Sequence, residues 1–446
     1  MRVSPVGPAH GRVWPSPLRA WFAAGVFALT AVLSYTDRQI LSLLVDPIRA
    51  TLHISDTQIS LVQGLAFALI YSFAGLPLGR VADIWPRRRT ILIGLLLWTL
   101  ATTACGISQS FGALFASRVF VGIGEAALAP AVISMLTDYF PPERRGIAIG
   151  FFLMGMVIGG GAALSIGGGL LQAADNGAFA ALPLLGAMAP WRVTLVVLGF
   201  SGIAMAAVIL AVREPPRPGR SSGESAQSWP LRQVIAAFAQ RRDVLLPLYL
   251  AMALMSIGDF GLLSWTPALL SRRFGMDPGH IGVQIGAISI VAAVLGVAGG
   301  GVLSDRAVIR NGIRGRLVFT TIAALFAATG TVIGFANSPD TILFCFGVWT
   351  LLSTANGVAA IVAVQDIVTT EMRGISVALN SFGNILFGLG AGATLPALLT
   401  DYVFDDPKAV GLSLTAVVAP AWLVAVVLYW KAMRAVPPCA VRMQSA

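Results

Sequence analysis

Charged residues are scarce in this sequence: they make up 11% of its 446 residues, whereas soluble domains contain about 25%. A water-soluble fold of this length could not cover its surface with so few charges. Hydrophobic residues account for 57% of the chain. Glycine, which lets membrane helices approach closely, occurs 48 times. The composition therefore predicts an all-α membrane protein surrounded by lipid.

Cysteine and histidine are also rare, with three residues of each. Cys105, Cys345 and Cys439 have no spacing that suits a metal site or a disulfide framework. The histidines lie in polar segments, and the sequence contains no H-E-x-x-H motif. We therefore expect no metal and no cofactor. An intramembrane enzyme is disfavoured because nucleophile and metal signatures are both missing.

Long apolar segments dominate the rest of the chain. A helix needs about 20 apolar residues to cross a bilayer core about 30 Å thick. We predict twelve transmembrane helices, at 19–45, 57–82, 90–108, 111–139, 146–172, 190–212, 243–271, 279–304, 315–337, 340–367, 374–401 and 408–433. Residues 1–17 lack the apolar core of a cleavable signal peptide, so we expect the first helix to be retained.

The predicted helices fall into two sets of six, separated by a segment rich in Pro, Arg, Ser and Gly. We divide the chain into an N-terminal tail (1–18), an N-terminal six-helix bundle (19–212), a linker (213–242), a C-terminal six-helix bundle (243–435) and a C-terminal tail (436–446).

The distribution of basic residues predicts the orientation. Of the 30 Lys and Arg residues, 23 fall in the loops and tails of one side, five in the loops of the other side, and two within predicted helices. The positive-inside rule places both termini in the cytoplasm, and we expect a bacterial inner membrane. The net charge of +10 thus reflects membrane orientation, and no nucleic-acid partner is expected.

Two motifs occur once in each half of the chain. Gly79-x3-Asp83 recurs as Gly301-x3-Asp305, and Asp138-x4-Glu143-x-Arg145-Gly146 recurs as Asp366-x4-Glu371-x-Arg373-Gly374. The offsets, 222 and 228 residues, differ by six, which fits a longer loop at 306–316. Such a repeat indicates two structurally related bundles.

These motifs resemble those of a known family. Gly79-x3-Asp83-x3-Arg87-Arg88-Arg89 resembles the loop signature between helices two and three of the major facilitator superfamily, although Ile84 and Pro86 replace its usual basic residue and glycine. Arg118-x3-Gly122-x-Gly124 resembles the helix-four motif of that superfamily. The resemblance implies two pseudo-symmetric six-helix bundles, the MFS fold.

A closer resemblance is to the spinster-like branch. It rests on Tyr35-Thr-Asp37-Arg38-Gln39, on Arg118-x6-Glu125-Ala, on Asp138-Tyr-Phe-Pro-Pro-Glu143, and on Trp265-x-Pro267. The resemblance implies that Asp37, Arg38 and Glu125 take part in proton coupling. It also implies that lipid-like substrates are possible, since eukaryotic members move sphingolipid-like or lysolipid molecules.

Charged residues inside membrane helices are costly and normally face a cavity or a partner. Arg118 and Glu125 are seven residues apart, so they share one face of the fourth helix. If the first and fourth helices face each other, Arg38 can pair with Glu125 while Asp37 stays available. The alternative is a static ion pair that only holds the bundle together.

Asp259 follows Asp37 by 222 residues, the same offset as Asp83 and Asp305, which makes it the counterpart of Asp37 on helix seven. It is a second protonatable or substrate-facing group, or a protonated carboxyl bonded to backbone; the sequence leaves these open. The residues that we expect to line the substrate cavity are Arg118, Asp259, Trp265, Asn380 and Asn384.

A further set of residues lies at the predicted cytoplasmic ends of helices. We expect them to form salt bridges between the two bundles that control conformational switching, with ordinary interfacial anchoring as the alternative. They are Gly79, Asp83, Arg87, Arg88, Asp138, Glu143, Arg145, Asp305, Arg306, Asp366, Glu371 and Arg373.

The sequence thus predicts a monomeric, proton-coupled secondary active transporter in the lipid bilayer, not an enzyme, that moves a small or amphipathic organic solute by alternating access. The alternative within the same fold is a proton-independent facilitator or exchanger of hydrophilic organic anions. A membrane sensor or scaffold is disfavoured because the longest predicted cytoplasmic segment has about 30 residues, too few for a signalling domain.

Overall fold

The computed structural model describes residues 14–216, 238–369 and 372–436, and this part of the chain is helical, without strands. It contains 11 helices that are long and apolar enough to cross a membrane. One of them, Pro278–Phe335, has 58 residues and is therefore long enough to cross twice. The prediction of an all-α protein with twelve membrane crossings is confirmed.

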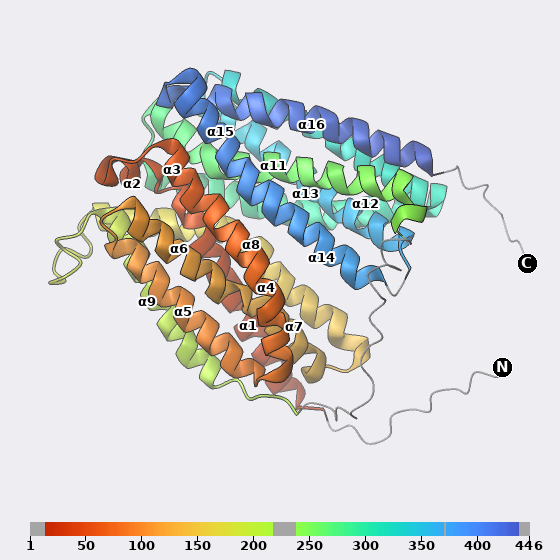
Figure 1. Ribbon diagram of the computed structural model, residues 1–446, viewed down its shortest axis with the longest axis horizontal. Coiled ribbons are helices and arrows are strands. Elements are labelled where there is room, and N and C mark those ends of the chain that lie inside the picture. Colours follow the sequence, from red (N-terminus) through yellow and green to blue (C-terminus); the bar gives the residue numbers. More distant parts are fainter. Residues whose placement is uncertain (1–13, 217–237, 370–371, 437–446) are drawn as a thin grey trace, which may run out of the picture.

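The helices form two halves that lie side by side (Figure 1). The N-terminal half consists of α1 (Pro17–Gln39), α2 (Val45–Leu52), α3 (Asp56–Ser60), α4 (Ala66–Ile84), α5 (Arg87–Ile107), α6 (Phe111–Ala126), α7 (Leu128–Tyr139), α8 (Pro142–Asp175) and α9 (Pro190–Leu210). The C-terminal half consists of α11 (Arg242–Phe274), α12 (Pro278–Phe326), α13 (Pro339–Ile367), α14 (Arg373–Gly383), α15 (Ala393–Leu399) and α16 (Val410–Ala435).

Several helices begin at a side chain that caps free backbone N–H groups. Ser110 accepts from the backbone N–H of Ala113 at the start of α6, and Ser338 does the same for Thr341 at α13. The Ser55–Gln58 capping box opens α3, which continues through a π-helical turn into α4. Such caps satisfy the donors that a helix leaves unpaired in its first turn.

The connection between the eighth and ninth predicted membrane helices differs from the one that we expect from the sequence. The longer loop expected at 306–316 is instead helical on both sides of one sharp kink within α12. At the kink Gly312 has φ +62°, a conformation that glycine adopts without strain. The arginines of this region thus lie on helical extensions rather than on an open loop.

Glycines bring the two halves into close contact. Where α8 packs against α12, a Cβ on Gly161 would lie 2.7 Å from the carbonyl oxygen of Gly286. On the other side of the interface, a Cβ on Gly64 would lie 2.3 Å from the carbonyl oxygen of Leu389. Only glycine permits these backbone approaches, so the halves meet along smooth helix surfaces.

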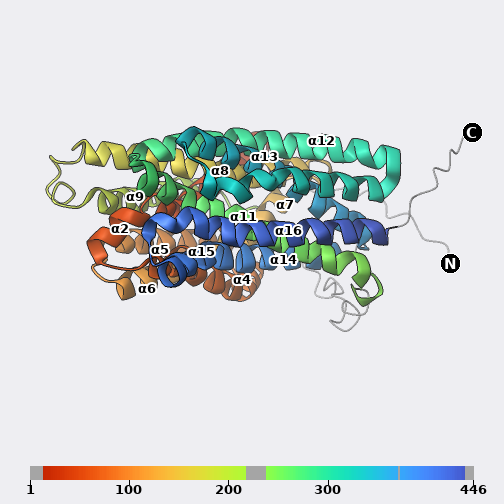
Figure 2. The same cartoon turned by 90° about the horizontal axis from the view of Figure 1, so that it is seen from above.

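The two ends of the molecule carry different segments. α1 begins at one end of the molecule (Figure 1), and α16 ends at the same end (Figures 1 and 2), which we call the terminal end. The connection from α1 to α4, which contains α2 and α3, lies at the opposite end, which we call the distal end. Many large apolar side chains between them are exposed, such as Leu100, Phe200 and Phe344, as expected for a lipid-facing surface.

Candidate functional site

A buried ion pair joins α1 to α6. Arg38 Nη2 lies 2.8 Å from Glu125 Oε2, and the hydroxyl of Ser34 donates to the same oxygen at 2.9 Å. Glu125 is 1% exposed and Arg38 8% exposed, so water screens the pair little. The expected facing of the first and fourth membrane helices, and the pairing of Arg38 with Glu125, are confirmed.

Aromatic rings surround the guanidinium of Arg38. Its Cζ atom lies 4.4 Å from the ring centre of Phe67, 4.7 Å from that of Tyr35 and 5.1 Å from that of Tyr71. These faces attract the cation but cannot accept its N–H groups as a carboxylate does. Glu125 is therefore the acid that holds Arg38 in place among the described residues.

Asp37 lies beside this pair but outside it. Its side chain is buried, and it faces Thr102 and Trp98 of α5 and Arg118 of α6. Its Oδ1 atom has no hydrogen-bond partner among the described residues. Asp37 thus lies outside the Arg38–Glu125 pair, as expected, and its role in proton coupling stays a prediction.

Arg118 is held by backbone rather than by an acid. Its Nη1 donates to the carbonyl oxygen of Asp37 at 3.2 Å, and its Nε donates to that of Val62 at 3.4 Å. Arg118 thus links α6 to α1 and to the π-helical turn before α4. Its Nη2 atom is buried without a partner within the described part of the chain.

Asp259 lies near the middle of α11, in the other half. Its Oδ1 accepts hydrogen bonds from Trp349 Nε1 at 2.8 Å and from the hydroxyl of Ser353 at 2.6 Å. Asp259, Asn380 and Asn384 line one cavity of about 280 Å³. Three of the five residues expected at the substrate cavity are therefore brought together.

Trp265 and Arg118 do not join these three. The indole N–H of Trp265 donates to the carbonyl oxygen of Ala393 at 2.8 Å, and the ring is fully buried. Trp265 thus packs α11 against α15. The sequence motif alone does not distinguish such a packing contact from a contact with substrate. Arg118 belongs to the N-terminal half, as described above.

At the distal end, ion pairs cross between the halves, which the sequence did not reveal. Arg272 of α11 pairs with Asp46 of α2 at 2.8 Å and with Asp56 of α3 at 2.7 Å. Asp401 accepts from the backbone N–H groups of Asp56 and Thr57 at 3.3 and 2.6 Å. These contacts hold the halves together at this end.

Comparison with known proteins shows which family has this architecture. The family model described as Major Facilitator Superfamily matches residues 27–394. The chain belongs to the major facilitator superfamily. It is 31% identical over 427 residues, 93% of each chain, to an "MFS-type efflux pump" of Mycolicibacterium smegmatis. It is 25% identical over 394 residues to a "Hexuronate transporter" of Bacillus subtilis, with 85% of this chain and 86% of that protein covered.

A solved structure of the spinster-like branch superposes closely. A bacterial homologue of the human lysosomal transporter Spinster, in an inward-facing and unoccupied conformation, gives a TM-score of 0.78 at 25% identity. The match covers 94% of this chain and 98% of that one. The resemblance to a spinster-like major facilitator superfamily transporter is thus confirmed, as is the two-bundle fold.

The superfamily loop signature between α4 and α5 organises the terminal end of the N-terminal half. Arg87 is buried and pairs with Asp138 of α7, and its Nε lies 2.9 Å from Glu214 Oε1. The Glu214 carboxylate also accepts the backbone N–H groups of Arg87 and Arg88, at 3.1 and 2.7 Å. Glu214 therefore caps α5, a role missed from the sequence although an acid directly after a membrane helix was the available signal.

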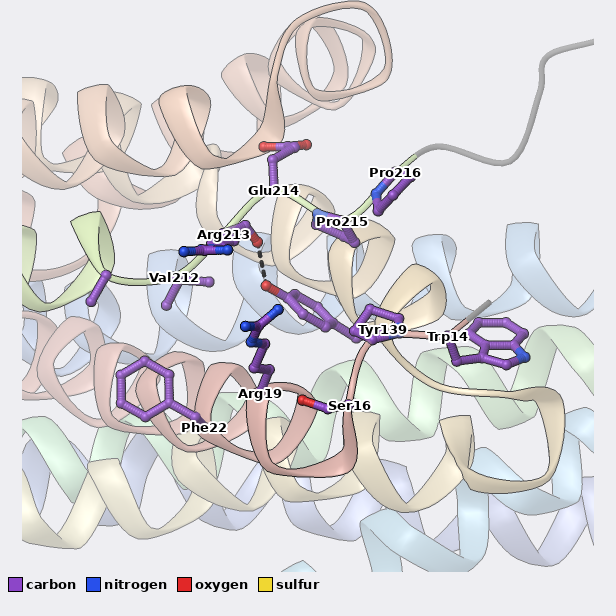
Figure 3. A pocket seen from close by; sticks show the side chains of 12 residues that line it. Trp14, Ser16, Arg19, Phe22, Tyr139, Val212, Arg213, Glu214, Pro215 and Pro216 are labelled. Atoms are coloured by element: carbon purple, nitrogen blue, oxygen red, sulfur yellow. Dashed lines mark hydrogen bonds between the residues drawn. The ribbon is translucent and has the colours of Figure 1, made fainter. Parts of the chain in front are cut away.

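A cavity of about 370 Å³ lies next to this network, at the start of α1. Figure 3 shows the hydroxyl of Tyr139 donating to the carbonyl oxygen of Arg213, with Arg19, Trp14 and Glu214 around the same space. The short segment after α9 is thereby bound to α7. These contacts fix the end of the N-terminal half as one unit.

The C-terminal half repeats the arrangement with its own residues. Arg316 lies 2.9 Å from Asp305 and 3.1 Å from Asp366, the counterpart of Asp138. At the terminal end, the ion pairs among these described residues form within a half. The expected role of this set in pairing between bundles stays a prediction, for a conformation other than this one.

The remaining members of the predicted set are placed as follows. Arg88 donates to the carbonyl oxygens of Leu210 and Val212, Arg145 donates to that of Phe140, Gly79 is half-buried, and Glu143 and Arg306 are exposed. Glu371 and the side chains of Asp83 and Arg373 lie outside the described part.

Proposed function

We propose that this protein is a proton-coupled secondary active transporter that moves a small or amphipathic organic solute by alternating access. The observation that carries the proposal is the buried Arg38–Glu125 pair with Asp37 beside it. Two acids and two arginines, Arg38 and Arg118, lie together in the N-terminal half. A proton bound to Asp37 or to Glu125 therefore changes the net charge of a buried site.

In this geometry, protonation of Glu125 changes the contacts that hold α1 against α6. Neutral Glu125 no longer holds the guanidinium of Arg38 by charge, and the other groups described around that guanidinium are the aromatic faces of Tyr35, Phe67 and Tyr71. The residues of α1 and α6 can shift relative to each other at lower cost. Protonation of Asp37 and Glu125 would thus lower the barrier between two arrangements of the halves and change their relative populations.

The ion pairs support a particular conformational assignment. Contacts that cross the halves close the distal end, whereas the described ion pairs of the terminal end stay within each half. The excess of basic residues around the terminal end supports a cytoplasmic location of that end. We accordingly assign the structure to an inward-facing state of a monomer in a bacterial inner membrane.

The test is proton-driven flux in proteoliposomes. Purified protein is screened by thermal shift with lysolipids, sugar acids and amphipathic drugs, and the flux of each hit is measured with and without a pH gradient. Asp37→Asn and Glu125→Gln are expected to abolish the response to the gradient. Asp340→Asn, an exposed acid in the first turn of α13, serves as the matched control. Undiminished coupling in both site variants would contradict the proposal.

A second candidate is a proton-independent facilitator or exchanger of organic anions. It is favoured by the Nη2 atom of Arg118, which is buried without a partner among the described residues, and by the hexuronate transporter among the relatives. A transport rate that is the same at all pH values, with sugar acids as the hits, would select this candidate.

A further inference from the structure

Asp259 is a half-buried acid of α11 that has no cationic partner within the described part of the chain. It forms no ion pair with any described residue, and its two hydrogen bonds, from Trp349 and Ser353, both go to Oδ1. The acids of the N-terminal site, by contrast, share their surroundings with Arg38 and Arg118. A carboxylate in a membrane interior normally has a positive partner. Since no Lys or Arg among the described residues lines the cavities beside Asp259, a bound cation could supply that partner.

The surroundings of Asp259 are those of a ligand site. The cavity of about 280 Å³ beside it is lined by uncharged polar groups from four membrane segments, among them Ser256, Asn356, Asn384 and Tyr429. Asp259 also lines a second cavity, of about 210 Å³, which reaches Gly160 and Gly161 of α8 in the other half. The carboxylate thus lies where the halves meet.

An apolar compartment adjoins the polar one. A cavity of about 550 Å³ between α11 and α14 shares Asn380 and Asn384 with the Asp259 cavity, and its other lining is mainly apolar, such as Leu246 and Phe387. One cation, Arg242, lines it, with its side chain 77% exposed next to Asp243. A carboxylate in a polar cavity that adjoins an apolar one matches a molecule with a cationic group and an apolar body.

We propose that the Asp259 cavity binds amphipathic organic cations, such as lipophilic amines or quaternary ions, with the positive group at the Asp259 carboxylate. This proposal rests on the proposed function for its biological meaning, since it names the substrate class of that transporter. Anions are disfavoured at this site because no Lys or Arg among the described residues lines either of the two cavities beside Asp259.

Binding of two ions of the same shape and opposite charge tests the proposal. Equilibrium dialysis of the full-length protein in nanodiscs, with empty nanodiscs subtracted, is carried out separately with tetraphenylphosphonium and tetraphenylborate, without any pH gradient. We expect saturable binding of the cation only. Asp259→Asn keeps an oxygen for Ser353 and Trp349 and is expected to raise the Kd about tenfold or more.

Two further variants control for folding. Asp259→Glu keeps the charge and should retain saturable binding, and Asp340→Asn should bind as the wild type does. Preference for tetraphenylborate, no saturable binding of either ion, or wild-type affinity in Asp259→Asn would overturn the proposal. Wild-type binding together with lost proton coupling in Asp259→Asn would assign the carboxyl to proton transfer instead, which also overturns it.

Flux measurements separate this proposal from the proposed function. Tetraphenylphosphonium uptake is followed in proteoliposomes with the membrane potential clamped by potassium and valinomycin. Asp259-dependent binding without pH-driven flux of any hit supports the cation site and contradicts proton coupling. The reverse outcome, pH-driven flux of a hit without Asp259-dependent binding of the cation, supports proton coupling and overturns the cation site.

Discussion

The distal and terminal ends of this transporter use similar ion pairs in different ways. At the distal end, Arg272 of one half pairs with Asp46 and Asp56 of the other. At the terminal end, Arg87 and Arg316 each pair with acids of their own half. Pairs within a half keep that half rigid, whereas pairs between halves must break when the halves rock. Pairs within a half should therefore determine the stability of the protein. Pairs between halves should determine the populations of its conformations.

The largest expected effect is loss of stability when a pair within a half is removed. Arg87→Ala leaves Asp138 and Glu214 without their shared cation, and we expect the free energy of unfolding to fall by about 2–4 kcal/mol, somewhat below the cost for a fully buried pair because both acids are partly exposed. Thermal unfolding in detergent measures the effect. The exposed neighbour variant Arg89→Ala should change stability by about 0.5 kcal/mol or less. Equal melting temperatures for the two variants would contradict the distinction.

A smaller effect, on populations, is expected at the distal end. Arg272→Gln removes both pairs that cross the halves, which should change the ratio of distal-open to distal-closed protein about 5–30-fold, equivalent to about 1–2 kcal/mol. Spin labels at Ala50 and Tyr402, one in each half, report this ratio as a distance distribution. The matched control is Arg273→Gln, because Arg273 bonds to Gly334 and Asn337 of its own half. A shift of equal size in the control would contradict the distinction between pairs within a half and pairs between halves.

The smallest effect is expected at Asp401. Its carboxylate accepts two N–H groups at the start of α3, and an anion in that position contributes about 0.3–1 kcal/mol. Asp401→Asn should therefore shift the same distance distribution in the direction of Arg272→Gln, but less. The exposed Asp405→Asn is the control. No shift in Asp401→Asn beyond that control would show that the capping contact does not help to close the distal end.

The helices and the central ion pair could be predicted from the sequence because both depend on local patterns. Hydropathy over about 20 residues locates a membrane helix, and a seven-residue spacing places Arg118 and Glu125 on one face. The pairing of Arg38 with Glu125 then required only that two helices face each other. The join at 306–316 was predicted incorrectly because its charges resemble those of a loop, while the chain continues as a helix beyond the apolar segment and turns at Gly312.

The pairs between halves could not be predicted in the same way. Asp46 and Asp56 lie in the connection between α1 and α4, whereas Arg272 lies in the last turn of α11. Only the packing of α8 on α12 and of α3 on α15 brings them together. The available signal was that Arg272 is one of only five basic residues on its side of the predicted membrane. Arg87 was expected to pair between the bundles, whereas its pairs in this structure lie within its own half. A repeated motif shows which residues are equivalent but not which of them meet, so pairing between the bundles stays a prediction for another conformation.

The central claim, that protonation beside Arg38 controls which end is closed, is tested most directly by distances measured at two pH values. Labels at Ala50 and Tyr402 report the distal end, and labels at Arg144 and Ile309 report the terminal end, in a background without the native cysteines. We predict that acidification changes both distributions in the wild type, in opposite directions. Glu125→Gln should show the acidic distributions at either pH. Wild-type distances that do not respond to pH, or a Glu125→Gln protein that responds as the wild type does, would contradict the account.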